Sequence, residues 1–501
     1  MKNSILFTAF FGSLLLFSCS KDEIEELTIE ETVEETNDEP DDVTSDPDPL
    51  TEQETIDLEI KDFIYRGLND IYLYKADTPE LADGYFENDS LKNQFLEKYD
   101  TPEILFNSLL SNKDRFSFIV DDYEALEDRF DGVSGATGMD FGLAQIQNTN
   151  NVIGFIQYIL PETSAEREGL KRGDIFTEVN GQQLTTTNFS TLLNQASFTI
   201  NVGYIENDRI VITDKTADLT DDRYTMNPVL ISKVLEIDNR KIGYIMYTSF
   251  IADFDDELNA AFGDLKSKGI TDLVLDLRYN GGGSVASATS LASMVTGQFT
   301  NEVFATEIWN DNYQEYYENV SPSSLINKFK NTIRTGETIN SLNLSQVYIL
   351  TSNSTASASE LIINGLNPYI DVVQIGTTTT GKFQASVTLY DSPNFNKSNI
   401  NQNHNYAMQP LVLKMANKLG NTDYEEGLTP DINIREDIRE LGELGNENEP
   451  LLSAAIDKIL NRTTVQLKSK HSRQLDYQKI GETNMLSPTY QRMYIDNVPF
   501  E

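Results

Sequence analysis

Histidine is nearly absent from this chain, and its scarcity limits the catalytic chemistry that the sequence can support. Only two histidines, His404 and His471, occur among the 501 residues. Neither lies in a segment that resembles a histidine-based catalytic triad. Because a serine nucleophile needs an adjacent general base, lysine is the expected base if this chain is a serine hydrolase.

Cysteine and basic residues are also scarce. Cys19 is the single cysteine, so no disulfide can form within the chain. Lysine and arginine total 38 against 80 aspartate and glutamate residues, which gives a net charge of −42. So acidic a chain repels phosphate backbones, and nucleic acid is not an expected partner. We predict neither a cofactor nor a bound metal.

The first 19 residues have the order of an export signal. Lys2 precedes an apolar stretch from Ile5 to Phe17, and Cys19 follows almost directly. The stretch is shorter than the apolar length that a membrane-spanning helix usually needs. We predict that residues 1–19 are a lipoprotein signal whose Cys19 is retained and lipidated, which would anchor the protein to the outer membrane of a cell envelope. The alternative is that Cys19 is a buried or stray thiol.

An acidic segment, residues 20–52, follows the signal. Residues 21–50 contain 14 aspartate and glutamate residues against one lysine. Such a segment cannot bury enough apolar surface to offset its ordering entropy, so we expect a disordered tether. Its start resembles the acidic export tags of surface lipoproteins in some Gram-negative bacteria. Whether the protein faces the periplasm or the exterior stays open, and digestion of intact cells with an added protease would decide it.

The remaining chain divides into four parts by its patterns. Residues 53–131 repeat apolar residues at helical spacing and predict a helical amino-terminal domain. Residues 132–220 predict a small β-domain, and residues 221–440 a mixed α/β core with an insertion of helices or loops at about 300–342. Residues 441–501 are expected to form a helical carboxy-terminal tail.

The predicted β-domain carries an apolar-glycine run and a hairpin signal. Phe141, Gly142 and Leu143 form the run, and Asn180-Gly181 is typical of a tight hairpin between two strands. With Gly173-Asp174 between them, this segment resembles a PDZ domain. The resemblance implies that an extended peptide adds as a strand and that residues 141–143 hold its terminal carboxylate. An ordinary small β-domain is the alternative.

The core alternates strands and helices, as βαβ units do. Residues 242–247 and 273–277 predict strands on either side of a helix, and the second strand runs into Gly281-Gly282-Gly283. A second unit places a strand at residues 347–350 and a helix from Ser357 to about residue 366. The strands are apolar enough to be buried in a partly parallel sheet.

Ser357 lies where that second strand passes into its helix. With Glu360 three residues later it forms a capping box, which needs no enzyme. The same position exposes a hydroxyl where free backbone amides and the helix dipole favour an oxyanion. The glycine run lacks the lysine and hydroxyl residue of a phosphate loop. We therefore expect the amides of Ala358 and of Gly282 or Gly283 to form an oxyanion hole.

Lys382 follows Ser357 by 25 positions and is the candidate base. A lysine base must be neutral, so an apolar pocket or a nearby cation has to lower its pKa. Taken alone, Lys382 would more often be a surface lysine after a glycine turn. Its pairing with the serine and glycine loops favours the catalytic interpretation.

These motifs resemble those of the carboxy-terminal processing, or tail-specific, serine peptidases. The family pattern is matched by residues 276–283, by Ser357 to Glu360 and by Gly381-Lys382, after a PDZ-like segment. The resemblance covers about residues 55–440 and implies a ClpP/crotonase-like core without a cofactor. It also implies a Ser357–Lys382 dyad, and substrates that are proteins or peptides, in particular their carboxy-terminal tails.

The sequence departs from the family pattern in residues 377–380 and at position 386. Many members place a glutamine four residues after the lysine to orient it, whereas this chain has Ser386 there and Gln384 two residues earlier. Either side chain could orient the amine of Lys382. A catalytically inactive surface protein that binds peptides or apolar ligands is therefore the alternative function, and a scaffold in a surface assembly is a third.

Overall fold

The computed structural model describes residues 51–462 and 476–495. The predicted signal, Cys19, nearly all of the predicted tether and His471 lie outside the described residues.

The amino-terminal region is helical, as the sequence predicted. Helix α1 begins after Thr51, whose hydroxyl accepts a hydrogen bond from the Glu54 amide, and its face with Ile60, Phe63 and Leu68 is buried. A single short strand, β1 (Phe118–Val120), interrupts the helices. The helices and 3₁₀ turns are α1 (Glu52–Ile71), η1 (Lys75–Asp77), η2 (Pro79–Leu81), α2 (Asp89–Leu96), α3 (Pro102–Leu109) and α4 (Tyr123–Phe130).

A second region, here called the β-domain, is built on one eight-stranded sheet with the strand order β24-β3-β4-β5-β8-β6-β7, in which β9 pairs with β8. Asn180 and Gly181 both have positive φ, 53° and 73°, and join β6 to β7 as the hairpin signal predicted. Its elements are β2 (Val133–Ala136), β3 (Met139–Ile146), β4 (Val152–Ile159), α5 (Ser164–Arg167), β5 (Ile175–Phe176), β6 (Glu178–Val179), β7 (Gln182–Gln183), α6 (Phe189–Leu193), β8 (Ser197–Glu206), β9 (Arg209–Thr220) and β10 (Asp222–Thr225).

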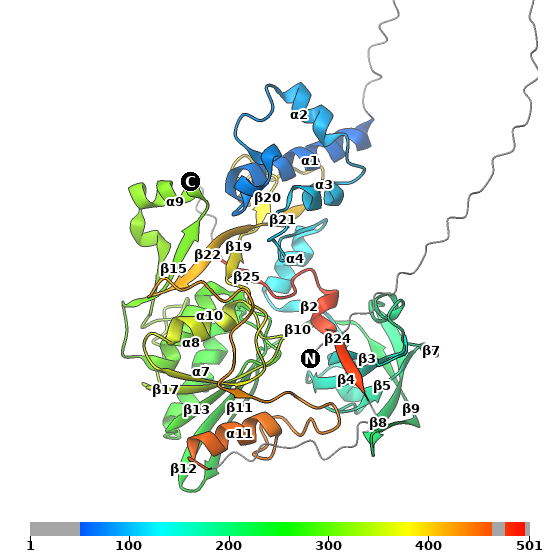
Figure 1. Cartoon of the computed structure of the whole chain (residues 1–501), viewed down its shortest axis with the longest axis vertical. Helices are drawn as coiled ribbons and strands as arrows, with labels where there is room; N and C mark the ends of the chain where they lie inside the picture. Colours follow the sequence, from blue (N-terminus) through cyan, green and yellow to red (C-terminus); the bar gives the residue numbers. More distant parts are fainter. Residues whose placement is uncertain (1–50, 463–475, 496–501) are drawn as a thin grey trace, which may run out of the picture. The chain divides into compact units, whose positions relative to one another are not determined.

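The core contains a mostly parallel sheet that matches the predicted βαβ pattern. Its order is β11-β12-β13-β17-β18-β23, with only β11 antiparallel to its neighbour. Helices α7, α8 and α10 pack on one face and α11 on the other (Figure 1). The elements are β11 (Val229–Ile237), β12 (Arg240–Tyr247), η3 (Ala252–Phe254), α7 (Asp255–Ser267), β13 (Asp272–Asp276), α8 (Val285–Thr296), β17 (Gln346–Thr351), α10 (Ala358–Leu366), β18 (Asp371–Gly376) and β23 (Ile432–Asn433).

A second six-stranded sheet corrects the expectation for residues 300–342, which are not helices and loops alone. Strand β15 pairs with β22 and β16, so the segment builds part of this sheet around one helix, α9. Local periodicity could not reveal this, because β22 lies about a hundred residues further along. The elements are β14 (Gly283–Ser284), β15 (Val303–Trp309), α9 (Asp311–Val320), η4 (Pro322–Leu325), β16 (Ile326–Lys328), β19 (Gln384–Ser386) and β22 (Leu411–Asn417); β20 (Leu389–Tyr390) and β21 (Ala407–Gln409) form a small sheet with β1.

The carboxy-terminal region is also corrected, because only part of it is helical. After α11 (Pro450–Ile459) come β24 (Tyr477–Glu482), η5 (Thr483–Leu486) and β25 (Met493–Tyr494), and the two strands enter two different sheets. Their partners lie far away in the sequence, so no local pattern marks them as strands. Within the described part of the chain, no helix is both long enough and apolar enough to span a membrane.

Candidate active site

Three neighbouring parallel strands bring the predicted motifs together. Strand β17 lies between β13 and β18 and is parallel to both. The carboxyl ends of parallel strands meet at one edge of a sheet, where ligands commonly bind. The loop after β13 carries the glycine run, the loop after β17 carries Ser357, and the loop after β18 carries Lys382. The order of strands thus explains why motifs about 75 and 25 residues apart converge.

Hydrogen bonds lock the serine loop onto the glycine loop. The Ala356 amide donates to the Asn280 carbonyl at 3.2 Å, and the Ser359 hydroxyl donates to the same oxygen at 3.0 Å. Thr355 Oγ1 donates to the Leu277 carbonyl at 2.8 Å. The position of Ser357 relative to the glycines is therefore fixed by several bonds.

Ser357 immediately precedes α10 in a backbone conformation that side-chain-bearing residues rarely adopt. Its φ is 68°, in the positive region where L-residues are strained. The side chain is fully buried, and its Oγ has no hydrogen-bond partner among the described residues. A buried hydroxyl without a partner at a helix amino terminus is costly for stability and suited to a nucleophile.

Glu360 joins the serine loop to the lysine loop through one carboxylate. Its Oε2 accepts from the amides of Ser357 at 2.7 Å and Lys382 at 2.9 Å, while Oε1 accepts from the Gly381 amide at 2.7 Å. Burial raises the pKa of Glu360, and these amides act in the opposite direction. The sequence predicted the contact with Ser357 but missed the one with the lysine loop, for which the motif holds no signal.

Lys382 is buried and not a surface residue. Its side chain is 1% exposed, and Nζ lies 4.7 Å from the ring centroid of Phe116. Burial lowers its pKa to about 7, against the opposing effects of Asp114 and Glu360. The amine donates to the Gln491 carbonyl at 2.9 Å and makes no hydrogen bond to Ser357 Oγ. The desolvation that a lysine base requires is present.

Neither predicted orienting residue holds the amine of Lys382 in this structure. Gln384 Nε2 donates to the Tyr74 hydroxyl at 2.8 Å, and Ser386 Oγ donates to Gln409 Oε1 at 2.5 Å. Tyr74 comes from the helical amino-terminal region and Gln409 from strand β21, and each accepts the hydrogen bond that the predicted residue donates. Gln384 Oε1 is nevertheless buried without a partner among the described residues.

The glycine loop approaches the serine too closely for any other residue. A Cβ on Gly282 would lie 2.7 Å from Ser357 Cβ and 3.0 Å from the Ala358 amide nitrogen, and φ of Gly282 is 106°. The Gly282 amide already donates to Asn280 Oδ1 at 2.8 Å. Gly282 and Gly283 were the two glycines predicted as oxyanion donors. Because the Gly282 amide is already engaged, the Gly283 amide is the remaining candidate, together with the amide of Ala358.

Phe141, Gly142 and Leu143 lie within strand β3 and not in a loop. The Phe141 amide donates to Thr483 Oγ1 at 2.7 Å, next to a bulge between Asp140 and Phe141. A cavity of about 330 Å³ extends from this strand to the glycine loop, with Phe141, Gly281 and Gly282 in its lining. Phe141 of the predicted substrate-binding run and Gly282, a predicted oxyanion donor, therefore border one cavity, whereas Ser357 and Lys382 are not in its lining.

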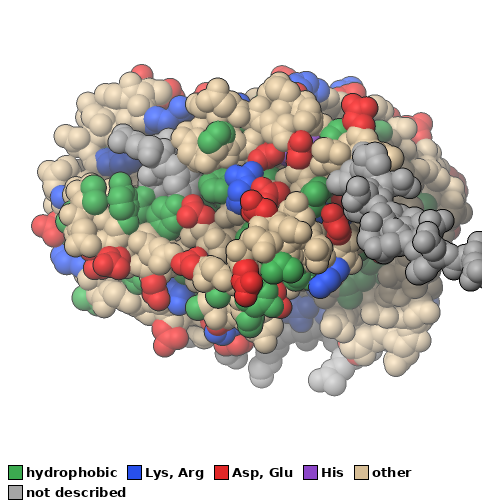
Figure 2. Space-filling model, turned by 90° about the horizontal axis from the view of Figure 1, so that it is seen from above, with side chains coloured by type: hydrophobic (Ala, Val, Ile, Leu, Met, Phe, Trp, Pro, Cys, Tyr) green, Lys and Arg blue, Asp and Glu red, His purple; other side chains and the backbone are tan. Residues whose placement is uncertain are grey.

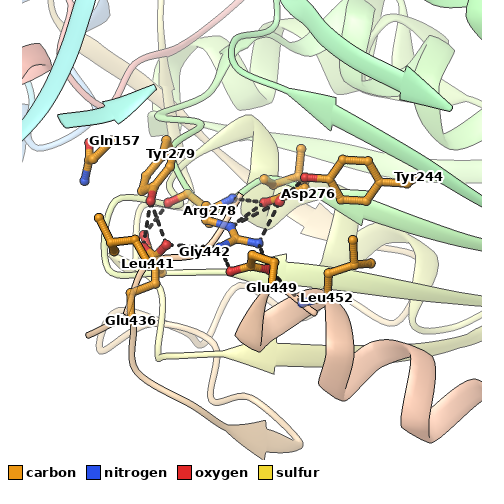
Figure 3. A network of polar contacts seen from close by, with 12 residues as sticks. Gln157, Tyr244, Asp276, Arg278, Tyr279, Glu436, Leu441, Gly442, Glu449 and Leu452 are labelled. Carbon is orange, nitrogen blue, oxygen red and sulfur yellow. Dashed lines mark hydrogen bonds and ion pairs between the residues drawn. The ribbon is translucent and has the colours of Figure 1, made fainter. Parts of the chain in front are cut away.

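A buried polar network surrounds Arg278, which precedes the glycine loop in the sequence (Figure 3). Arg278, which is fully buried, pairs with Asp276 at 2.9 Å, Glu449 at 2.6 Å and Glu436 at 3.0 Å. Arg172 of the β-domain also pairs with Glu436, at 2.7 Å. Burial raises the pKa of Glu436, but the two arginines outweigh it and lower the value to about 2. The network joins the β-domain, β13 and the start of α11.

His404 is not part of the site. His404 pairs with Asp391 at 3.1 Å, away from the three loops. Within residues 51–462 and 476–495 no group of histidine, cysteine and acidic side chains could hold a metal ion.

Comparisons with known proteins agree with this geometry. The model of peptidase family S41 matches residues 241–434, and that of the peptidase S41 N-terminal domain matches residues 59–118. A carboxyl-terminal-processing protease of Picosynechococcus sp. is 25% identical over 247 residues, 49% of this chain and 52% of that protein. The carboxy-terminal processing protease CtpA of Bacillus subtilis is 24% identical over 319 residues, 64% of this chain and 58% of that protein. The chain thus spans little more than half the length of these relatives.

Solved structures include a putative S41 protease from Bacteroides fragilis, which matches with a TM-score of 0.62 and 26% identity over 80% of this chain and 97% of that one. It shares the mixed α/β fold that the sequence predicted. From the three strand-end loops, the matched family models and this shared fold, we conclude that the chain belongs to peptidase family S41, together with the carboxyl-terminal processing proteases.

Proposed function

We propose that the protein is a serine endopeptidase with Ser357 as nucleophile and Lys382 as general base. The observation that carries this proposal is the buried Ser357 hydroxyl, which has no hydrogen-bond partner among the described residues. It lies on a strained backbone, in a loop that Glu360 joins to the loop of the buried Lys382. Ser357 Oγ attacks the carbonyl carbon of a peptide bond, and Lys382 takes the hydroxyl proton and passes it to the leaving amine. Water then hydrolyses the acyl-enzyme.

The Ala358 amide is the first proposed oxyanion donor, and the Gly283 amide the second. Ala358 is the first residue of α10, so its amide has no acceptor within the helix. Donors fixed in a dry site stabilise developing negative charge without reorganisation.

The proposed substrates are proteins or peptides with an extended carboxy-terminal tail. The edge of β3 in the β-domain is the proposed capture site, in the way that PDZ domains add a peptide as a strand. The Phe141 amide faces a hydroxyl, that of Thr483, where a bound peptide would place its carboxylate. The cavity between β3 and the glycine loop supports passage of the captured chain to Gly282, which closely approaches Ser357.

Hydrolysis of an unfolded test protein with an apolar carboxy-terminal tail tests the proposal. We expect Ser357→Ala to lower the rate by at least about a thousandfold, because the nucleophile is lost. Ser324→Ala, which changes an exposed serine in η4, is the matched control and should keep the wild-type rate. Equal hydrolysis by wild type and Ser357→Ala would contradict the assignment. Peptide binding without turnover by the wild type would favour the alternative, a binding protein that keeps the peptidase fold.

A further inference from the structure

The carboxy-terminal segment, residues 476–495, follows the path proposed for a substrate. Its strand β24 pairs antiparallel with the edge of β3, from Tyr477 opposite Ile146 to Glu482 opposite Gly142. The chain direction therefore runs toward Phe141, as it would for a peptide whose end is captured there. Thr483 Oγ1 then accepts from the Phe141 amide at 2.7 Å. The segment occupies the proposed capture edge.

The second half of the segment enters the catalytic centre. Strand β25 lies between β14, which contains Gly283, and β19, which follows Lys382, and it pairs with both in parallel. The Ile495 amide also donates to the Ser386 carbonyl at 3.1 Å. A strand in this place separates the glycine loop from the strand after the lysine, where an extended substrate would lie.

One peptide bond of the segment is presented to Ser357. The point where a Cβ on Gly282 would lie is 2.3 Å from the Arg492 carbonyl oxygen, 2.7 Å from Ser357 Cβ and 3.0 Å from the Ala358 nitrogen. The Arg492 carbonyl thus lies among the nucleophile and the proposed oxyanion donors. Lys382 Nζ donates to the preceding carbonyl, that of Gln491, at 2.9 Å. A neutral amine that donates there keeps its lone pair for the Ser357 proton.

Side-chain contacts fix the segment on both sides of this bond. Gln491, in a left-handed conformation with φ of 55°, donates from Nε2 to Thr380 Oγ1 at 3.0 Å. The Arg492 guanidinium lies 5.2 Å from the Phe130 ring centroid, and Tyr494 stacks on the same ring at 4.5 Å. Upstream, Glu482 binds Ser354, three residues before the nucleophile. The bond is held in place by its own chain before any substrate arrives.

We propose that the protein cleaves itself between Arg492 and Met493, an inference that rests on the proposed peptidase function. Ser357 Oγ bonds to the Arg492 carbonyl carbon and gives its proton to Lys382. The bond to the Met493 nitrogen breaks as Lys382 returns that proton to it, which frees residues 493–501 with a new amino terminus. Water hydrolyses the ester and leaves Arg492 as the new carboxy terminus.

Cleavage would also open the catalytic end of the substrate path, while β24, which precedes the cleaved bond, stays paired with β3. Loss of residues 493–501 removes β25 and leaves the space between β14 and β19 for the strand of another substrate. Met493 is fully buried and Tyr494 is 6% exposed, so their departure exposes apolar surface that an incoming peptide can cover.

Mass spectrometry of the purified full chain tests this inference. Wild type, Ser357→Ala and Met493→Pro are prepared in parallel and incubated at pH 8 over a hundredfold range of concentration. We expect wild type to lose its last nine residues, 493–501, at a rate independent of concentration, because the bond lies in its own site. Both variants should retain them, at least about a hundredfold longer, since one lacks the nucleophile and the other replaces the amide with a proline ring.

Hydrolysis of the unfolded test protein is measured in the same preparations. Wild type that hydrolyses the test protein yet keeps residues 493–501 would overturn self-cleavage and leave the proposed function standing; β25 would then be a structural strand only. Wild type that does neither would overturn both. Equal loss from Ser357→Ala, or a rate proportional to concentration, would contradict cleavage of the chain by its own site.

Discussion

The proposed chemistry depends on a single amine that must be neutral near neutral pH. Lys382 meets this need because burial lowers its pKa from 10.5 to about 7. Phe116, which comes from the helical amino-terminal region, supplies part of the apolar surface around the amine. Residues far apart in the sequence thus set the reactivity of one side chain.

The pH dependence of kcat/KM follows from this pKa. The base works only when deprotonated, so activity should be full above about pH 7 and fall by about tenfold per pH unit below it. The measurement is kcat/KM for a tailed peptide between pH 5 and 9.

Lys382→Arg is the matched variant for this profile. A guanidinium stays protonated throughout this range, so the variant should be inactive at every pH. A wild-type profile that still rises by about tenfold between pH 8 and 9 would contradict the lowered pKa.

At the residue scale, the sequence predicted the serine and the lysine but not what surrounds them. The motifs and their spacing were enough to select Ser357 and Lys382 as the candidate pair. Gln384 and Ser386 could not be assigned correctly, because their hydrogen-bond partners, Tyr74 and Gln409, come from other elements. The roles of Glu360 toward the lysine loop and of Gln491 toward the amine also needed the structure.

At the scale of elements, local patterns predicted those whose partners are near in sequence. The strands at β12, β13, β17 and β18 carry apolar runs bounded by turns, and the structure confirms them as one parallel sheet. The strands β15 and β24 were missed, because they pair with strands about a hundred and more than three hundred residues away. Such pairing is decided by tertiary packing and not by local propensity.

The buried ion pairs of Arg278 connect three elements of the fold. Arg278 neutralises carboxylates from β13, from the segment after β23 and from the start of α11. We expect Arg278→Met to lower the free energy of unfolding by about 3–5 kcal/mol, because the buried carboxylates Asp276 and Glu449 lose their partner. The measurement is urea unfolding followed by circular dichroism.

Arg240→Met is the control for this substitution. Arg240 pairs with Asp272 at 3.1 Å, but its side chain is 45% exposed. Loss of so exposed a pair should change the free energy of unfolding by less than about 1 kcal/mol. Similar effects of the two substitutions would contradict a structural role for the buried network.

At the scale of the molecule, the site combines all described regions of the chain. The helical region supplies Phe116, the β-domain its β3 edge, the core its three loops, and the carboxy-terminal segment the strand that lies in the site. On the face shown in Figure 2, acidic and basic side chains are interspersed, and lysine and arginine do not gather into one patch. Attachment to a membrane through Cys19 stays a prediction.

The central claim is that Ser357 is the nucleophile and that Lys382 activates it. Its most direct test is peptide mapping of the full chain after treatment with a serine-reactive fluorophosphonate. We predict one covalent adduct on Ser357 Oγ, formed at least about a hundredfold more slowly in Lys382→Ala. An adduct on a different serine, or an unlabelled Ser357 in a preparation that hydrolyses the test protein, would contradict the account.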